Sequence, residues 1–320
     1  MDTITQGLLG AAIAEAGFRR KLGGKAVAFG FLVAVAPDLD VVAGAFGHWA
    51  FLVHHRGVTH SLIAMPLAAP LIAWLGYRWA KRRGGYLPWL HLALWALVTH
   101  PLLDLMNSYG TQIFAPLSRK RYALDTISVI DLFYSVPLLA AVVLACFPRV
   151  PSKARRNVAA GALALSTAYL GLGYYQSSRA VGMGRSQLAE KGFVPEEIRA
   201  TPMMGTVWRW RVVARSAEGD YRVGVLSTWA PHRIAFKRIQ RPSHPLVAKA
   251  LATDEGRVFE WFTMGWVHGE VKDSENGAVV VLHDLRYVLP EDLSQSVFAA
   301  RWEFDEDGGV DSVKRLSPRR

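Results

Sequence analysis

The chain has 320 residues, of which 51% are hydrophobic and 20% are charged, and its formal net charge is +11 at pH 7. Its single cysteine, Cys146, excludes an internal disulfide framework and a cysteine-based metal site. The basic residues lie in short runs between apolar segments, which is typical of cytoplasmic loops in membrane proteins. We therefore expect no nucleic-acid partner.

Acidic residues are distributed unevenly along the chain. Only seven of the 26 lie in residues 1–175, and the other 19 lie in residues 176–320. Scarce charge and long apolar stretches are typical of membrane-embedded segments. We predict an α-helical polytopic membrane domain over residues 1–175, followed by a small soluble α+β domain with an antiparallel sheet over residues 176–320.

The N-terminal domain begins with a short amphipathic or buried helix, predicted over residues 1–16. About five membrane segments follow, at residues 26–46, 62–80, 86–106, 131–147 and 158–175. Basic clusters separate them at residues 19–25, 81–83 and 149–156. If these clusters lie in the cytoplasm, the polar turns between them gather at the opposite membrane surface. The C-terminal domain is then extracytoplasmic.

Acids and histidines recur at these turns. Pro37 to Asp40 (PDLD) places two carboxylates in an apolar stretch, which is unfavourable unless they face a cation or a polar cavity. Val53 to Ser61 (VHHRGVTHS) contains three histidines and Arg56. His100 and Asp104 are four residues apart, so one helical face presents both. Each feature also has a structural interpretation, as a helix cap, a polar loop or a buried His–Asp hydrogen bond.

Together these residues predict a metal centre with mixed nitrogen and oxygen ligands. Such ligands suit zinc or manganese, and we expect roughly one to three divalent ions. A bound ion activates water, and a neighbouring guanidinium stabilises a phosphate. A centre at a membrane surface favours an amphiphilic or anionic substrate among the membrane lipids. The predicted metal ligands are Asp38, Asp40, His55, His60, His100, Asp104 and Asp131, and the predicted catalytic groups are Asp104, Asp125 and Arg56.

The C-terminal domain shows a different pattern. A helix is predicted over residues 177–199, and period-two alternation then predicts strands over residues 207–215, 221–227, 257–264, 278–287 and 297–304. Five tryptophans are predicted to line its core or a groove: Trp208, Trp210, Trp261, Trp266 and Trp302. Four histidines lie at no ligand spacing and are interpreted as structural: His232, His244, His268 and His283. This domain is expected to bind substrate or a protein partner.

The motifs MDTITQGLLGAAI, PDLD, HHRGVTHS, THPLLDLMNSYGT and RYALDTISVIDLFY together resemble membrane-bound metal-dependent hydrolases. This family is also described as LexA-binding, inner-membrane-associated hydrolases. The resemblance implies a multi-pass inner membrane protein, distantly related to zinc-dependent phospholipase C. By motif, it implies the same seven ligand positions, with Arg56 as their basic partner. Many members carry Thr-His where this chain has Thr5-Gln6, so no N-terminal histidine ligand is carried over.

Three classes of function remain open. The leading hypothesis is a metal-dependent hydrolase of a lipid-borne phosphoester. An ion- or proton-coupled transporter is the second, because intramembrane acids and histidines also form ion pathways. The third is a membrane-anchored interaction protein with a vestigial site. Clustering of the polar groups at one surface, beside basic residues, favours hydrolysis over transport.

Overall fold

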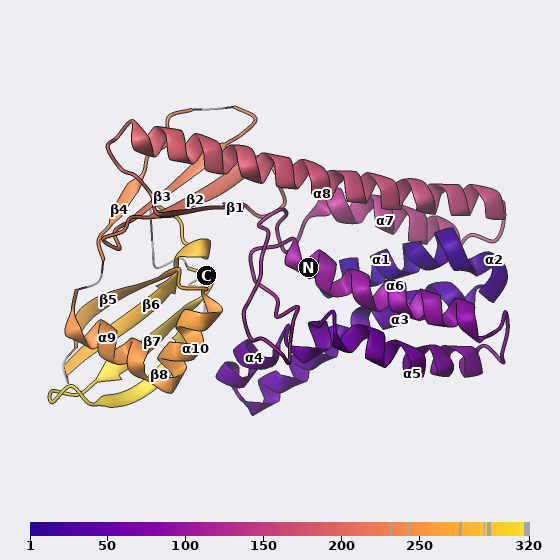
Figure 1. Cartoon of the computed structure of the whole chain (residues 1–320), viewed down its shortest axis with the longest axis horizontal. Coiled ribbons are helices and arrows are strands. Elements are labelled where there is room, and N and C mark those ends of the chain that lie inside the picture. The colour runs from indigo at the N-terminus through magenta and orange to yellow at the C-terminus, as the bar shows by residue number, and fades with distance from the viewer. Residues whose placement is uncertain (231, 242, 275–276, 291, 293–295, 317–320) are drawn as a thin grey trace. The chain divides into compact units, whose positions relative to one another are not determined.

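Helices fill the chain up to Ala189, and strands follow from Glu197 (Figure 1). The computed structural model describes residues 1–320 except 231, 242, 275–276, 291, 293–295 and 317–320. A helical unit comprises Met1–Phe46, His54–Tyr175 and Met204–Val207. A C-terminal unit comprises Gly47–Val53, Gln176–Met203 and Trp208–Arg320.

The helical unit is built from apolar helices joined by turns and, between α6 and α7, by the long irregular segment 106–131. Its elements are α1 (Thr3–Ile13), η1 (Ala14–Phe18), α2 (Arg19–Leu22), α3 (Lys25–Val35), η2 (Ala36–Phe46), η3 (Val58–His60), α5 (Ala64–Trp79), α6 (Tyr86–Leu105) and α7 (Leu132–Ala145). Helix α4 (His48–His54) lies between η2 and η3, and α8 (Ser152–Ala189) continues into the C-terminal unit. At Pro37, α3 gives way to the tighter η2, because proline supplies no backbone N–H to the helix.

Small residues let α1 and α3 approach closely. A Cβ atom added to Gly10 would lie 2.2 Å from the carbonyl oxygen of Gly30, and one added to Gly30 would lie 2.4 Å from that of Gly10. On the neighbouring α6, the buried Trp89 ring meets Phe29 edge to face, with 5.0 Å between ring centroids. Close packing of this kind holds helices together where lipid removes the hydrophobic driving force between them.

The number of membrane spans is smaller than expected. Among the described residues, two helices are long and apolar enough to cross a bilayer, Lys25–Phe46 and Ser152–Ala189. A third span is reached if His48–His60 and Ala64–Trp79, which are bent by 70°, count as one. The expected five segments are therefore not supported. Helices α5 and α7 have 16 and 14 residues, fewer than the ~20 that a bilayer requires.

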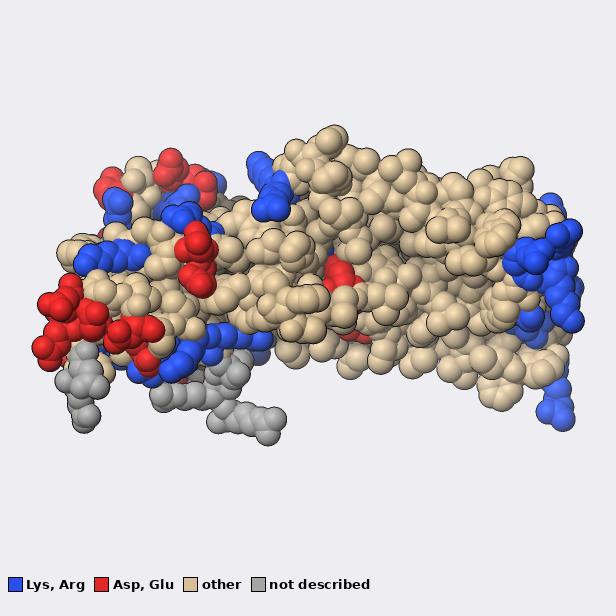
Figure 2. Space-filling view, turned by 90° about the horizontal axis from the view of Figure 1, so that it is seen from below, with Lys and Arg blue, Asp and Glu red and all other residues tan. Residues whose placement is uncertain are grey.

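The three predicted basic clusters meet at one end of the helical unit, which we call the basic end (Figures 1 and 2). The loops that connect α2 to α3, α5 to α6 and α7 to α8 all lie there. Arg19 Nη1 donates a hydrogen bond to the Ala145 carbonyl oxygen at 2.8 Å, which joins α2 to the end of α7. Figure 2 shows Lys and Arg gathered at this end beside an uncharged surface. This distribution is typical of a membrane protein.

The C-terminal unit contains two antiparallel sheets rather than one. The first has the order β1-β2-β3-β4, and the second has the order β5-β6-β7-β8. Their strands are β1 (Glu197–Pro202), β2 (Arg209–Arg215), β3 (Tyr221–Ser227), β4 (Lys237–Ile239), β5 (Val267–Ser274), β6 (Gly277–Asp284), β7 (Ala299–Phe304) and β8 (Val310–Leu316). Helix α9 (Pro245–Ala252) and helix α10 (Asp254–Phe262) lie between the sheets in sequence. Trp210 and Trp302 are fully buried, as expected of core aromatics.

One strand prediction in this region was wrong, and one helix prediction held only in part. Residues 257–264, predicted as a strand, belong largely to α10, because Thr253 caps that helix and accepts a hydrogen bond from the Gly256 N–H at 3.0 Å. Phe259 and Phe262 are buried three residues apart, as one helical face requires. The helix predicted over residues 177–199 is confirmed as far as Ala189, as the second half of α8, but residues 197–199 belong to β1.

Gly30→Ala should lower the unfolding temperature of the detergent-solubilised protein. The added methyl group would collide with the Gly10 carbonyl, and such overpacking costs about 1–3 kcal/mol. Gly161→Ala is the matched control, because a Cβ atom there meets nothing within 4 Å and alanine favours a helix by about 1 kcal/mol. If Gly30→Ala melted at or above the temperature of the wild type, the close helix contact would be contradicted.

Acid should destabilise the second sheet through His283. This histidine is buried opposite His268 in the β5–β6 pair, and burial lowers its pKa to about 4, although Glu270 opposes the shift. An unfolded histidine titrates near ~6.5, so the unfolded state takes up the proton first. Stability is therefore lost as the pH falls from about 6.5 towards 4, by roughly 2 kcal/mol at about pH 5. Hydrogen exchange of β5 and β6 amides measures this loss, and His283→Gln should remove most of it.

Candidate metal centre

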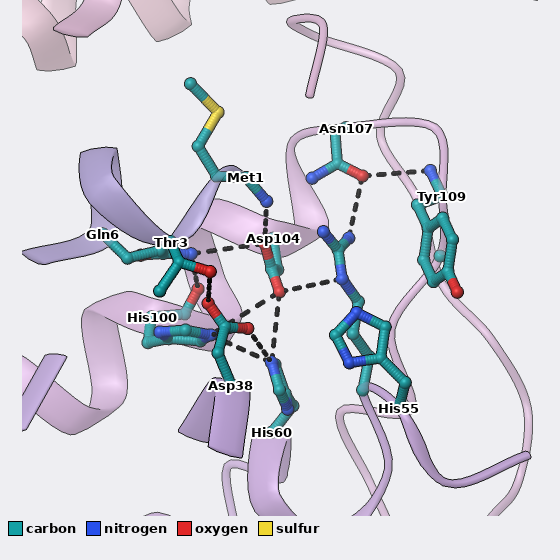
Figure 3. A network of polar contacts seen from close by, with 12 residues as sticks. Met1, Thr3, Gln6, Asp38, His55, His60, His100, Asp104, Asn107 and Tyr109 are labelled. Carbon is teal, nitrogen blue, oxygen red and sulfur yellow. Dashed lines mark hydrogen bonds and ion pairs between the residues drawn. The ribbon is translucent and has the colours of Figure 1, made fainter. Parts of the chain in front are cut away.

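Four side chains from three elements of the helical unit point towards one another (Figure 3). Asp38 comes from η2, His60 from η3, and His100 and Asp104 from α6. One ligand atom of each lies within 4.8 Å of the others, and all four side chains are buried. His100 Nε2 lies 3.7 Å from Asp104 Oδ2, so the four-residue spacing does place both on one helical face.

The two imidazoles face each other through their Nε2 atoms, which are 2.9 Å apart. His100 Nδ1 lies 2.5 Å from the Ala34 carbonyl oxygen, which can only accept, so Nδ1 carries the proton. His60 Nδ1 lies 3.2 Å from Asp40 Oδ2, which likewise accepts. A neutral imidazole has one N–H, so both Nε2 atoms present lone pairs to each other. This arrangement is repulsive unless a cation lies between them or one ring is protonated.

The carboxylates complete the ligand set. Asp38 Oδ1 lies 3.4 Å from the Nε2 atoms of both His60 and His100. Asp104 Oδ2 is buried, 3.4 Å from His60 Nε2 and 3.0 Å from the Nε atom of Arg56, which supplies one positive charge beside it. Two buried carboxylates beside two facing lone pairs favour a further cation or a proton nearby. The residues present therefore fit a divalent ion with two nitrogen and two oxygen ligands, although they do not identify the metal.

Arg56 lies beside this group, as expected. Its Nε atom is 3.0 Å from Asp104 Oδ2, and its Nη1 donates to Asn107 Oδ1 at 2.9 Å. The guanidinium carbon lies 4.6 Å from the centre of the Tyr109 ring. The side chain is thus buried and held from two sides. Its positive charge adjoins a metal ligand without being one.

Asp40 and His55 hold the turn that carries His60, rather than joining the four grouped ligands. Asp40 contacts His55 Nδ1 at 2.7 Å and accepts from Thr59 Oγ1 at 2.6 Å and from the Arg56 N–H at 3.0 Å. Its contact with His60 Nδ1 fixes that ring in the tautomer that a metal requires. Carboxylates commonly orient metal-bound histidines in this way.

Asp131 and Asp125 also lie outside the four-residue group found among the described residues. Asp131 caps α7: Oδ1 accepts from the Phe133 N–H at 3.1 Å, and Oδ2 accepts from the Tyr169 hydroxyl at 3.1 Å. Asp131 was predicted as a metal ligand, but in the structure it is the N-cap of α7. Asp125 is buried in the loop before α7, with a backbone φ of 50°.

Several residues of the centre were not singled out from the sequence. Thr3 Oγ1 donates to Asp38 Oδ2 at 2.7 Å, and Gln6 Nε2 donates to Asp104 Oδ1 at 3.2 Å. The Met1 nitrogen contacts the same oxygen of Asp104. The motif MDTITQG, in which Gln6 replaces a histidine common in the resembled family, was the signal that could have placed the N-terminus here. Thr59 and Asn107 likewise lie inside motifs already noted.

A family model described as "YdjM inner membrane protein" matches residues 1–180, more than half of the chain and all of the centre. The chain belongs to the YdjM inner membrane protein family. Membership in the YdjM family supports the expected inner-membrane location. It shows neither a hydrolase activity nor a relationship to phospholipase C.

Two further proteins are similar in sequence to this YdjM-family chain. "Uncharacterized protein YfhP" of Bacillus subtilis (strain 168) is 28% identical over 260 residues, which are 79% of this chain and 74% of YfhP. "Inner membrane protein YbcI" of Escherichia coli (strain K12) is 37% identical over 82 residues, which are 25% of this chain and 46% of YbcI. The match to YfhP exceeds 180 residues, so it reaches into the C-terminal unit. No solved structure matches this chain.

Elemental analysis of the purified protein should find a near-stoichiometric transition metal that is lost in His100→Ala and in Asp104→Asn. His91→Ala, at an exposed position of the same helix, should retain it. Asp40→Asn should weaken metal affinity by about 10–100-fold, because it removes an orienting partner and no grouped ligand. A wild type that stays metal-free after supplementation with zinc and manganese would mean that a protonated histidine balances the carboxylates.

Proposed function

We propose that this protein is a membrane-bound, metal-dependent hydrolase that cleaves a phosphoester on a lipid-like substrate. The observation that carries the proposal is the pair of facing Nε2 atoms on His60 and His100, flanked by two buried carboxylates. A ligand set of this kind, in a family of inner membrane proteins, suits chemistry on molecules that reside in the bilayer.

A zinc or manganese ion held by the four residues supplies Lewis acidity and lowers the pKa of a bound water towards neutrality. The chain's own residues supply orientation. Asp40 and the Ala34 carbonyl fix the two imidazole rings, and Gln6 and Thr3 fix the two carboxylates. The positions of the ligands are therefore set before a substrate arrives, which is the condition for a preorganised site.

Arg56 is proposed to bind the phosphate. Its guanidinium adjoins Asp104 and is held in place by Asn107 and Tyr109, so its charge is fixed next to the ligands. A guanidinium so placed favours an anion whose charge grows during displacement at phosphorus. Asp104 is assigned to the ion, and Asp125, which is outside the grouped residues, is assigned no role.

A second candidate is an interaction protein stabilised by a structural ion. Burial favours it, because His60, His100 and Asp104 have 0% exposure, whereas a catalytic ion keeps a position open to water and substrate. The hydrolase requires the turn between His55 and His60 to open for substrate. The structural role requires no opening. Activity and metal content measured on the same samples separate the two.

The test is hydrolysis of bis(p-nitrophenyl) phosphate and of phospholipid vesicles by the metal-loaded protein. Activity should be lost in His100→Ala together with the metal. In Arg56→Gln it should fall by about 10²–10³-fold while the metal stays bound, because Arg56 is the proposed partner of the phosphate and is not one of the four grouped ligands. His91→Ala should be fully active. Metal-loaded wild type that cleaves none of these substrates, and that melts lower after chelation, would favour the structural ion.

A further inference from the structure

A basic pocket of about 970 Å³ lies at the basic end of the helical unit, formed by residues 15–24 and the first turn of α8. Six basic residues line it: Arg19, Arg20, Lys21, Lys153, Arg155 and Arg156. The only acid among its lining residues is Glu15. Figure 2 shows this end of the unit as a dense group of Lys and Arg.

Glu15 neutralises only part of this charge. It is buried, with Oε2 2.6 Å from Arg19 Nη1 and Oε1 3.7 Å from Arg155 Nε. The Nε atom of Arg155 is itself buried without a hydrogen bond. One carboxylate against six cations leaves an excess of five positive charges around the pocket. Such an excess of positive charge, which Glu15 only partly offsets, fits an anion with several oxygens.

An apolar groove of about 500 Å³ continues from this pocket. The two share Arg19 and Gly24, and the rest of the groove is lined by apolar residues of α1, α3 and α7, among them Phe31, Leu32 and Val142. Leu32 is 61% exposed, so the groove faces the lipid side of the unit. A hydrocarbon chain can pack against such an apolar surface, whereas a water-soluble phosphate ester has no apolar chain to place there.

We infer that this combination is a binding site for an anionic phospholipid, with the phosphate in the basic pocket and an acyl chain in the groove. The site is made from residues outside the metal centre and does not depend on the proposed hydrolase. Lys81 and Arg82, on the loop between α5 and α6, are exposed and line neither cavity. They provide the comparison between a specific site and general attraction to an anionic membrane surface.

Cys146 reports on the groove directly. It is the single cysteine of the chain, it is exposed, and it lines the groove. The experiment measures the rate at which a small maleimide alkylates it in detergent-purified full-length protein. The probes are dioctanoyl phosphatidylglycerol, dioctanoyl phosphatidylcholine and inorganic phosphate. Phosphatidylglycerol should slow alkylation at a lower concentration than phosphatidylcholine does, and inorganic phosphate should not slow it.

Two kinds of variant test whether the pocket and the groove are responsible for the protection of Cys146. Arg20→Gln with Lys153→Gln should raise the half-protecting concentration of phosphatidylglycerol about thirty-fold, whereas Lys81→Gln with Arg82→Gln, with the same change of charge, should leave it unchanged. Gly24→Leu should abolish protection with the charges intact, because Gly24 lines the groove and a Cβ atom there meets nothing within 4 Å, so the larger side chain can be added without a clash. The unprotected rate is measured for each variant.

Equal protection by the two phospholipids would overturn the preference for an anion. An equal loss in both charge variants would reduce the site to diffuse attraction. Protection by inorganic phosphate alone would overturn the lipid assignment. A thermal melt would show whether the variant that combines Arg20→Gln with Lys153→Gln is folded. If it is not, Gly24→Leu provides the test, because full protection of Cys146 in that variant would contradict binding of an acyl chain in the groove.

Discussion

The carboxylate of Asp104 is fully buried in an apolar helical unit, and the N-terminal half of the chain is arranged to satisfy it. An uncompensated buried charge costs several kcal/mol, and an apolar membrane helix supplies few polar groups that could compensate it. Arg56 and His60 approach one oxygen, and Gln6 donates to the other. Removing any one of these partners leaves the rest of the network less satisfied, so segments distant in sequence are held in place together.

The backbone departs from regular helix where this network needs it. Helix α3 changes into η2 at Pro37, which brings Asp38 and Asp40 near the centre. Arg56 has a φ of 62°, a conformation that costs a non-glycine residue energy. That turn directs the Arg56 side chain towards Asp104 while its N–H meets Asp40. The irregular segments are thus the parts of the helical unit that position polar groups.

Part of the candidate metal centre could be predicted from the types of residue in the sequence. Charge is so scarce before residue 176 that Asp38, His60, His100 and Asp104 were evident candidates, and the His100–Asp104 spacing fixed their shared face. The separate roles of Asp40 and Asp131 were not evident, because a ligand, an orienting carboxylate and a helix cap use the same side chain and differ only in three-dimensional partners. Residues 257–264 were predicted as a strand from their alternation, but most of them form a helix that Thr253 caps. The predicted number of membrane spans was too high, because apolar composition alone does not distinguish a short buried helix from one that crosses the whole bilayer.

The charges around the centre affect the order in which a cation and an anion can bind. Asp38, Asp40 and Asp104 contribute three negative charges, Arg56 and the Met1 ammonium contribute two positive charges, and two neutral imidazoles add none, so the group carries −1. Coulomb repulsion in a buried region is weakly screened, and a phosphate would be opposed there. One divalent ion would bring the sum to +1. In the proposed function, cation loading would therefore act as a checkpoint, because an anion would be attracted only after the ion had bound.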